Sequence, residues 1–264
     1  MKQSIHRLVV KVGTSTLTYA TGNINFRRLS RLVEVLSDIS NSGVQVVLVS
    51  SGAIAVGVGK LGLPARPTDV PGRQAAAAVG QSELMFLYDK IFSEYSKITS
   101  QMLLTGSDME DPERRSHLVN TFEQLLQFGS LPIVNENDSV SVEEIIHGDN
   151  DCLSAEVAAL IGADALAILT DIDGLYDSDP RENAKARRIS VVEEITPEIL
   201  GAAGGAGSAR GTGGMATKLR AAQIATKAGV DTYIINGTPP DNLYALMEGR
   251  DIGTLFCAIK EERI

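Results

Sequence analysis

The stretch from Asn135 to Asp151 carries six carboxylates and no lysine or arginine. It follows an apolar run, residues 130–134, that has the length and composition of a buried strand. In α/β folds, polar side chains that follow a strand line a pocket at the carboxyl end of the sheet. An acidic pocket repels phosphate and attracts an ammonium group or a metal ion. This stretch therefore predicts a site for a positively charged group.

A solvated surface hairpin is the alternative interpretation of the middle of this stretch. Asn135, Asp138 and the turn 148–151 flank that hairpin where the chain meets the core, so they are the better candidates for binding a ligand. The hairpin itself would contain four apolar residues and two exposed glutamates: Val140, Val142, Ile145, Ile146, Glu143 and Glu144.

Three loops carry residues suited to binding an anion. Lys11 ends the first predicted strand, shortly before Gly13. Burial of a lysine is unfavourable unless its ammonium group faces an anion. A lysine on an edge strand that points to water is an equally good interpretation of this residue. The run SSGAIA (50–55) ends a strand before a helix, where main-chain amides favour anions. Lys218 ends the glycine-rich loop 211–218 and opens an amphipathic helix, which is typical of phosphate binding. An exposed lysine at a helix cap is the alternative there.

Two stretches match known binding motifs, but the surrounding residues argue against both assignments. The run GVGKLG (57–62) matches a dinucleotide-binding pattern, but it does not lie between a strand and a helix, and prolines soon follow. The acidic spacing from Asp171 to Asp179 resembles a calcium loop, but Tyr176 occupies the position that requires glycine.

Composition narrows the class of protein. The net charge of −9 argues against nucleic acid as the main partner. No apolar run reaches the length of a membrane span, and the N-terminal residues lead into a strand pattern rather than a signal peptide. Cys152 and Cys257 are far apart and give neither a disulfide framework nor a metal-ligand spacing. We expect a cytoplasmic protein that binds neither a membrane nor nucleic acid.

Apolar runs of strand length recur at 8–12, 44–49, 98–104, 131–134, 165–169 and 232–235. Helical periodicity separates most of them, notably at 29–39, 74–95 and 153–161. Strands that alternate with helices predict a mostly parallel sheet with helices on both faces. The 264 residues are enough for one large α/β domain or for two lobes sharing a sheet.

The ordered series of motifs resembles the amino-acid kinase family, from residue 8 to about 256. Within the family it is similar to the branch that phosphorylates glutamate, because NEND and GDND occur together. Many members carry a C-terminal PUA domain, and we expect none in this chain. The motifs are KVGTS (11–15), SSGAIA (50–55), QMLLT (101–105), NEND (135–138), GDND (148–151), LTD (169–171), G-L-Y (174–176), DP (179–180), GTGGMATK (211–218) and GTLF (253–256).

The resemblance implies an α/β fold, a three-layer α/β/α sandwich around a mostly parallel sheet. It implies one domain over residues 1–264, with a glutamate-binding lobe at about 1–165 and a nucleotide-binding lobe at about 166–264. The implied activity is transfer of the γ-phosphoryl group of ATP, with Mg²⁺, to the γ-carboxylate of L-glutamate, the first step of proline synthesis. It further implies feedback inhibition by proline, a homo-oligomer, and channelling of the product to glutamate-5-semialdehyde dehydrogenase.

The same resemblance assigns roles to individual residues but names no protein ligand for a metal. Implied for catalysis are Lys11, Lys218, Asp151, Gly52 and Gly13. Implied for glutamate binding are Ser51, Asp138, Asn150, Asn135 and Asp149. Implied for ATP binding are Lys11, Thr170, Asp171, Thr212, Gly213, Gly214, Met215, Ala216, Thr217 and Lys218.

The histidine content of the sequence fits phosphoryl transfer to a carboxylate, independently of the resemblance. A carboxylate nucleophile has a reference pKa of about 4.3 and needs no general base. None of the three histidines, His6, His117 and His147, stands in a nucleophile–base arrangement. Three alternatives are an acetylglutamate kinase, a nucleotide-binding regulator without turnover, and a dinucleotide dehydrogenase. The acidic stretch favours a substrate with a free ammonium group over an N-acetylated one.

Overall fold

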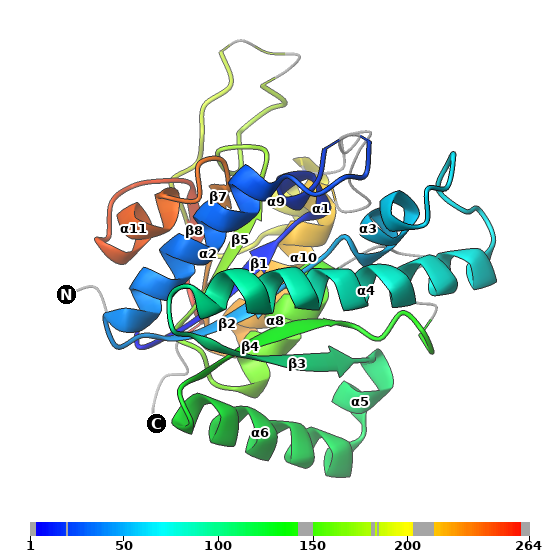
Figure 1. Ribbon diagram of the computed structural model, residues 1–264. Coiled ribbons are helices and arrows are strands. Elements are labelled where there is room, and N and C mark those ends of the chain that lie inside the picture. Colours follow the sequence, from blue (N-terminus) through cyan, green and yellow to red (C-terminus); the bar gives the residue numbers. More distant parts are fainter. Residues whose placement is uncertain are drawn as a thin grey trace.

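The computed structural model describes residues 4–19, 21–141, 150–180, 183, 185–202 and 214–259. Within these ranges the chain forms an eight-stranded sheet with helices on both faces (Figure 1). The strands follow the order β3-β4-β2-β1-β5-β7-β8-β6 across the sheet. In chain order they are β1 (Arg7–Val12), β2 (Gln45–Val49), β3 (Ile98–Leu104), β4 (Ser130–Glu136), β5 (Ala165–Thr170), β6 (Val191–Val192), β7 (Asp231–Asn236) and β8 (Thr254–Phe256).

Neighbouring strands run parallel except where β7 meets β8. The central strand β1 lies between β2 and β5, and its Lys11 pairs with Val49 on one side and Ile168 on the other. Because parallel strands end at the same edge, the carboxyl ends of β4, β2, β1 and β5 lie side by side. This edge gathers the polar residues that follow those strands.

The helices form one layer on each face of the sheet. Apolar residues of α2, α3, α4 and α11 pack on one face, and those of α5, α6, α8 and α10 pack on the other. This arrangement confirms the predicted α/β/α sandwich around a mostly parallel sheet. The helices are α1 (Thr14–Leu17), α2 (Phe26–Asn41), α3 (Ala53–Lys60), α4 (Val70–Ser93), α5 (Gly106–Glu110), α6 (Pro112–Gln127), α8 (Asn150–Leu160), α9 (Pro197–Ala202), α10 (Met215–Lys227) and α11 (Asn242–Met247).

Strand β1 divides its side chains between the two cores. Val10 packs with the layer that contains α2 and α4, whereas Val9 packs with the layer that contains α8 and α10. Alternate residues of a strand point to opposite faces, so Lys11 shares the face of Val9. Lys11 therefore points towards α8 and α10, which carry Asp151 and Lys218 in their first turns.

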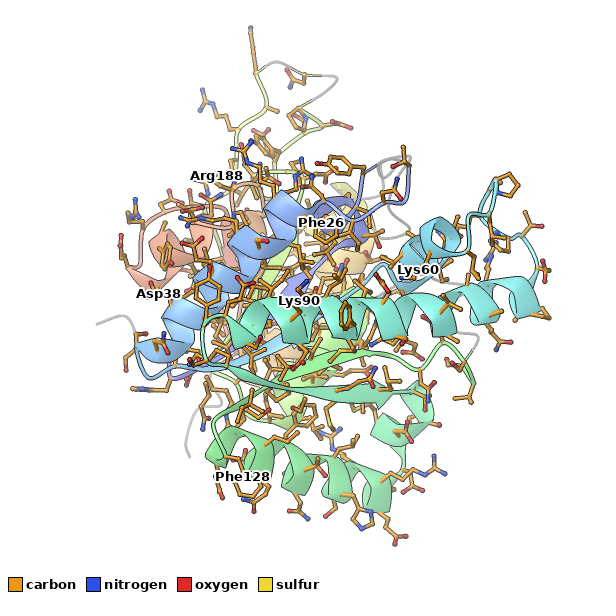
Figure 2. The ribbon with its side chains drawn as sticks, in the orientation of Figure 1. Phe26, Asp38, Lys60, Lys90, Phe128 and Arg188 are labelled. Carbon is orange, nitrogen blue, oxygen red and sulfur yellow. The ribbon has the colours of Figure 1, made fainter. Side chains whose placement is uncertain are left out.

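Two glycines let α3 and α4 pack with their main chains in contact. A Cβ at Gly57 would lie 1.8 Å from the carbonyl oxygen of Ala76, and a Cβ at Gly80 would lie 1.8 Å from that of Ala53. Lys60 lies exposed at the outer end of α3 (Figure 2). It forms an ion pair of 2.9 Å with the half-buried Glu83 of α4. The run 57–62 thus begins inside a helix and serves helix packing, which agrees with its rejection as a dinucleotide motif.

The predicted elements lie within a few residues of the observed ones. Helix α4 begins at Val70, earlier than predicted, because Asp69 caps it by accepting from the N–H of Gly72 and Pro71 stands in its first turn. Helix α8 also begins early, at Asn150, so the acidic turn enters the helix itself. Strands β6 and β8 are two and three residues long, too short to give a periodic signal.

The acidic run from Asp171 to Asp179 does not gather into a calcium loop. Tyr176 instead forms an antiparallel bridge with Arg188. Across the described part of the chain, no group of three or more histidine, cysteine, aspartate or glutamate side chains is placed to bind a metal. Among those same residues, no helix combines the length and the apolar character needed to cross a bilayer.

Candidate active site

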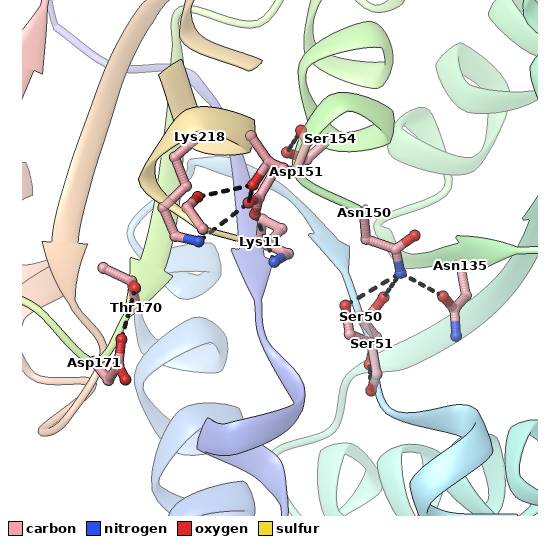
Figure 3. Close-up of polar contacts among 12 residues, drawn as sticks. Lys11, Ser50, Ser51, Asn135, Asn150, Asp151, Ser154, Thr170, Asp171 and Lys218 are labelled. Carbon is pink, nitrogen blue, oxygen red and sulfur yellow. Dashed lines mark hydrogen bonds and ion pairs between the residues drawn. The ribbon is translucent and has the colours of Figure 1, made fainter. Parts of the chain in front are cut away.

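The carboxyl edge of the sheet carries polar side chains from four neighbouring strands (Figure 3). Lys11 comes from β1, Ser51 follows β2, Asn135 belongs to β4, and Thr170 ends β5. Helices α8 and α10 begin at this edge. The fold therefore brings together residues that are far apart in the sequence.

Asp151 lies between two lysine ammonium groups (Figure 3). Its Oδ1 is 2.6 Å from Nζ of Lys11, and its Oδ2 is 3.2 Å from Nζ of Lys218. The carboxylate side chain is 1 % exposed, and the two lysine side chains are 10 % and 9 % exposed. Among the residues that the structure describes, these two buried ammonium groups share one carboxylate. Such a cluster favours an anion as its further partner.

Asp151 is held in its ionised form. Burial by itself would raise the pKa of this carboxyl, but the charges of Lys11 and Lys218 lower the pKa to about 2. The hydroxyl of Thr217 also donates to Oδ2 of Asp151 at 2.9 Å. In addition, Asp151 stands in the first turn of α8, where the helix dipole favours a negative charge. The carboxylate therefore holds both ammonium groups in place at neutral pH.

Gly13 and Gly52 lie in the loops that follow β1 and β2. Gly52 has a φ of +94°, in the left-handed region that favours glycine, and a Cβ there would lie 3.4 Å from the side chain of Thr14. A Cβ at Gly13 would lie 3.9 Å from Nζ of Lys11. The two loops therefore meet beside the Lys11 ammonium group. Donation from their amides to phosphoryl oxygens stays a prediction.

A cluster of amide and hydroxyl groups joins β2, β4 and α8. Nδ2 of Asn150 lies 2.6 Å from the carbonyl oxygen of Ser50, 3.2 Å from Oγ of Ser51 and 2.7 Å from Oδ1 of Asn135. Asn135 and Asn150 are 1 % and 2 % exposed. Oδ1 of Asn150 is buried and has no hydrogen-bond partner among the described residues. A buried oxygen of this kind is a favourable acceptor for a ligand N–H.

Asp138 is a buried carboxyl group two residues beyond the end of β4. Burial raises the pKa of Asp138 to about 6; the charge of Glu136 acts in the same direction, whereas Arg66 lowers it. Oδ1 of Asp138 is buried and lacks a hydrogen-bond partner within the described ranges. This oxygen is suited to accept from an ammonium group, whose charge would favour the ionised carboxylate.

Thr170 and Asp171 lie on the Lys218 side of the site, opposite the amide cluster (Figure 3). The Thr170 hydroxyl donates to Oδ1 of Asp171 at 3.2 Å. Residues 214–218, which include Gly214, Met215 and Ala216, form the N-cap and the first turn of α10. Their predicted contacts with a nucleotide stay predictions.

Comparison with known proteins assigns the chain to a family. The model of the amino acid kinase family matches residues 6–236. The chain belongs to this family. It is 54 % identical to the glutamate 5-kinase of Clostridium perfringens, covering 97 % of both chains. It is 51 % identical to the glutamate 5-kinase of Clostridium acetobutylicum, covering 96 % of this chain and 95 % of the relative.

A solved structure with low sequence identity shares the fold. The UMP kinase of Bacillus anthracis matches with a TM-score of 0.64, covers 98 % of both chains and is 18 % identical. This likeness confirms the amino acid kinase architecture. Membership of the amino acid kinase family also implies the use of ATP.

The candidate site contains two residues of α4 that the sequence analysis missed. Oε1 of Gln81 accepts from Nδ2 of Asn135 at 2.8 Å, and the hydroxyl of Tyr88 lies 3.0 Å from that of Ser50. Polar residues inside a long helix are usually solvated, so neither gave a signal alone. Their spacing of two helical turns, with the buried Leu84 between them, places both on the inner face and was the available clue. Of the predicted site residues, Asp149, Thr212 and Gly213 lie outside the described ranges.

Proposed function

We propose that the chain transfers the γ-phosphoryl group of ATP to the γ-carboxylate of L-glutamate, forming glutamyl 5-phosphate for proline biosynthesis. The structural observation that carries this proposal is the pair of buried ammonium groups around Asp151, at 2.6 and 3.2 Å. Relatives 51–54 % identical over nearly the whole chain are named glutamate 5-kinase, which supports the choice of substrate.

Electrostatic stabilisation carries the chemical step. A γ-carboxylate oxygen attacks the γ-phosphorus while the bond from this phosphorus to the β–γ bridging oxygen breaks. Lys11 and Lys218 place positive charge at the transferring phosphoryl group and at the leaving oxygen. Because both lysines are nine-tenths buried, their charges act in a medium of low dielectric constant. No proton has to be removed from the nucleophile, since the carboxylate is already ionised.

Asp151 is a positioning residue in this mechanism. Its two oxygens each hold one lysine, so the distance between the two ammonium groups is fixed before the substrates bind. Preorganised charges of this kind need no rearrangement in the transition state. The carboxylate also offsets part of the repulsion between the two lysines.

Glutamate binds on the other side of the site, through its α-ammonium and α-carboxylate groups. Asp138 and the carbonyl oxygen of Asn150 accept from the ammonium group, and Ser51 and Asn135 complete this end of the site. Asp149 belongs to the same predicted set. An N-acetyl group carries no positive charge and would leave Asp138 unpaired, which disfavours the alternative of an acetylglutamate kinase.

ATP binds between the end of β5 and the N-terminus of α10. Free N–H groups of that first turn favour the phosphates, and Thr212 and Gly213, which precede it in the sequence, belong to the same predicted set. In proteins, Mg²⁺ is commonly held by substrate phosphates, water and one or two carboxylates rather than by a protein cage. A Mg²⁺ ion of this kind would bind together with ATP and neutralise its phosphates.

A hydroxylamine trap of the acyl phosphate tests the proposal. The purified protein is incubated with Mg-ATP and with glutamate, N-acetylglutamate or aspartate in parallel. Glutamate should give acyl hydroxamate, with N-acetylglutamate poorer by up to about 10⁴-fold, because a buried charge is left unpaired. Comparable turnover of glutamate and N-acetylglutamate would contradict the assignment.

Proline inhibition is part of the proposal. Proline shares the α-carboxylate and the α-ammonium group of glutamate but lacks the attacking γ-carboxylate. A pocket that contains Asp138, Asn135 and Asn150 recognises mainly the shared half, so proline would bind at or overlapping the glutamate site. Assembly into a homo-oligomer, cytoplasmic location and channelling to glutamate-5-semialdehyde dehydrogenase stay predictions.

A further inference from the structure

Helix α4 supports the glutamate side of the site through Gln81. Its Oε1 accepts from Nδ2 of Asn135, which is 1 % exposed, at 2.8 Å. The preceding residue, Gly80, packs directly against the main chain of Ala53 in α3. This close helix–helix contact fixes the position of Gln81 next to the end of β4.

Main-chain groups fix the orientation of both asparagine amides. The N–H of Glu136 can only donate, and it donates to Oδ1 of Asn135 at 3.0 Å. The carbonyl oxygen of Ser50 can only accept, and it accepts from Nδ2 of Asn150 at 2.6 Å. Nδ2 of Asn135 must therefore face Gln81, and the group of Gln81 that meets it must be the acceptor oxygen.

A directed series of hydrogen bonds results. Asn150 donates to Oδ1 of Asn135 at 2.7 Å, and Asn135 donates to Gln81 at 2.8 Å. At the far end, Oδ1 of Asn150 is buried and has no partner among the residues described. The side chain of Gln81 thus closes the series at one end, and an acceptor remains available at the other.

We propose that Gln81 is a positioning residue that sets the affinity for the amino-acid substrate. This inference rests on the proposed function, because it assigns the available oxygen of Asn150 to the α-ammonium group of glutamate. An apolar side chain at position 81 leaves a buried donor of Asn135 unsatisfied. Asn135 then rotates to find another acceptor, and Asn150 loses one of its own acceptors. Gln81 itself does not contact the substrate.

Three variants test the role of the acceptor oxygen. Gln81→Met removes the acceptor oxygen at nearly constant side-chain size, and Gln81→Glu retains an acceptor oxygen. Gln124→Met is the matched control, because it makes the same glutamine-to-methionine change at an exposed residue of α6. Hydroxamate formation is measured with glutamate and ATP varied in turn, together with the thermal midpoint Tm. Gln81→Met should raise KM for glutamate by about tenfold, as expected for one unsatisfied buried donor. KM for ATP should stay within about twofold, and Gln81→Glu and Gln124→Met should stay within about threefold of wild type.

Results that differ from these expectations would overturn either the role of Gln81 or the proposed function. An unchanged KM for glutamate in Gln81→Met, an equal rise in Gln81→Glu, or parallel rises for glutamate and ATP would overturn the role of Gln81. If the methionine variant does not fold, Gln81→Lys replaces the acceptor by a donor and must show the same selective rise. Absence of glutamyl hydroxamate from the wild-type protein would overturn the proposed function itself, whereas an active wild type with an unaffected Gln81→Met overturns only this inference.

Discussion

Lys11 and Asp151 form an ion pair of 2.6 Å in which the carboxylate is 1 % exposed. The second oxygen of the same carboxylate faces Lys218 at 3.2 Å, so removal of either lysine leaves Asp151 paired with the other. The two lysines can therefore be tested one at a time. Removal of the carboxylate is a harsher change, because it leaves two buried ammonium groups without their shared counter-ion.

Lys218→Ala should lower kcat by roughly 10²-fold or more, because the lost charge acts on the phosphoryl group in the transition state. Lys11→Ala should have a similar effect. Steady-state hydroxamate kinetics measure both, and circular dichroism checks that the fold is retained. Lys227→Ala, at the exposed end of the same helix α10, is the matched control and should keep the wild-type kcat. A Lys218→Ala variant with wild-type kcat and a raised KM for ATP would show that Lys218 only anchors the nucleotide.

The efficiency kcat/KM for glutamate should fall as the pH drops below about 6, the raised pKa of Asp138. Below this pH the folded protein protonates Asp138, and the charge that attracts the α-ammonium group is lost. The slope should approach about tenfold per pH unit, since one proton is bound. Asp138→Asn should have a low efficiency without this inflection. An inflection that persists in Asp138→Asn would belong to another group.

The same shift affects stability in a definite direction. The folded pKa of about 6 exceeds the model value of 3.8, so the folded chain binds the proton more tightly than the unfolded chain. Asp138 therefore destabilises the fold above about pH 6, and this penalty is relieved as the pH falls towards 3.8. Asp151 behaves oppositely: its stabilising contribution is present above 3.8 and is lost as the pH falls through about 2.

Gly57→Ala should destabilise the fold by about 1–3 kcal/mol or more, because its Cβ would lie 1.8 Å from the carbonyl oxygen of Ala76. Gly59→Ala is a matched control in the same helix, since a Cβ there meets atoms no closer than 3.4 Å. It should be neutral or stabilising by up to about 1 kcal/mol through helix propensity. Denaturant unfolding measures both. Equal stability of the two variants would contradict the main-chain contact between α3 and α4.

Asp138→Ala should weaken glutamate and proline together, because both ligands present the same α-ammonium group. A charged hydrogen bond contributes about 1.5–3 kcal/mol to the binding of each. Kinetics with proline as the varied inhibitor supply the inhibition constant alongside KM for glutamate. Proline inhibition that stays intact while KM rises about tenfold, which corresponds to 1.4 kcal/mol, would place the inhibitor elsewhere.

Local patterns in the sequence predicted the fold, whereas the grouping of Lys11, Lys218 and Asp151 was implied by the family resemblance. Apolar runs marked the six longer strands, whereas the position of each lysine alone left a structural and a functional interpretation open. The central position of Lys11 in the sheet resolves its two interpretations: it is an inner-strand lysine, 8 % exposed, and not an edge residue pointing to water.

The supporting residues could not be predicted in the same way. Gln81 and Tyr88 acquire their roles only after α4 packs on α3 and on the sheet. Their helical spacing marks the inner face of α4, but it does not identify the partners that they meet there. Thr217 is a related case: the prediction placed it with ATP, and its hydroxyl in addition bonds Asp151. Whether the Thr217 hydroxyl bonds Asp151 or the nucleotide when ATP is bound depends on the Thr217 rotamer, which local sequence patterns do not specify.

The ion-pair centre has a consequence for synthesis of the chain on the ribosome. Its three members belong to β1, α8 and α10, and the last of them emerges only after most of the 264 residues have been translated. A nascent or truncated chain that ends before Lys218 can pair Lys11 with Asp151 but lacks the second ammonium group. Such a chain could form much of the sheet, since β1 to β5 precede residue 218, and still have no catalytic charge arrangement. The charge arrangement proposed for phosphoryl transfer is therefore complete only late in synthesis.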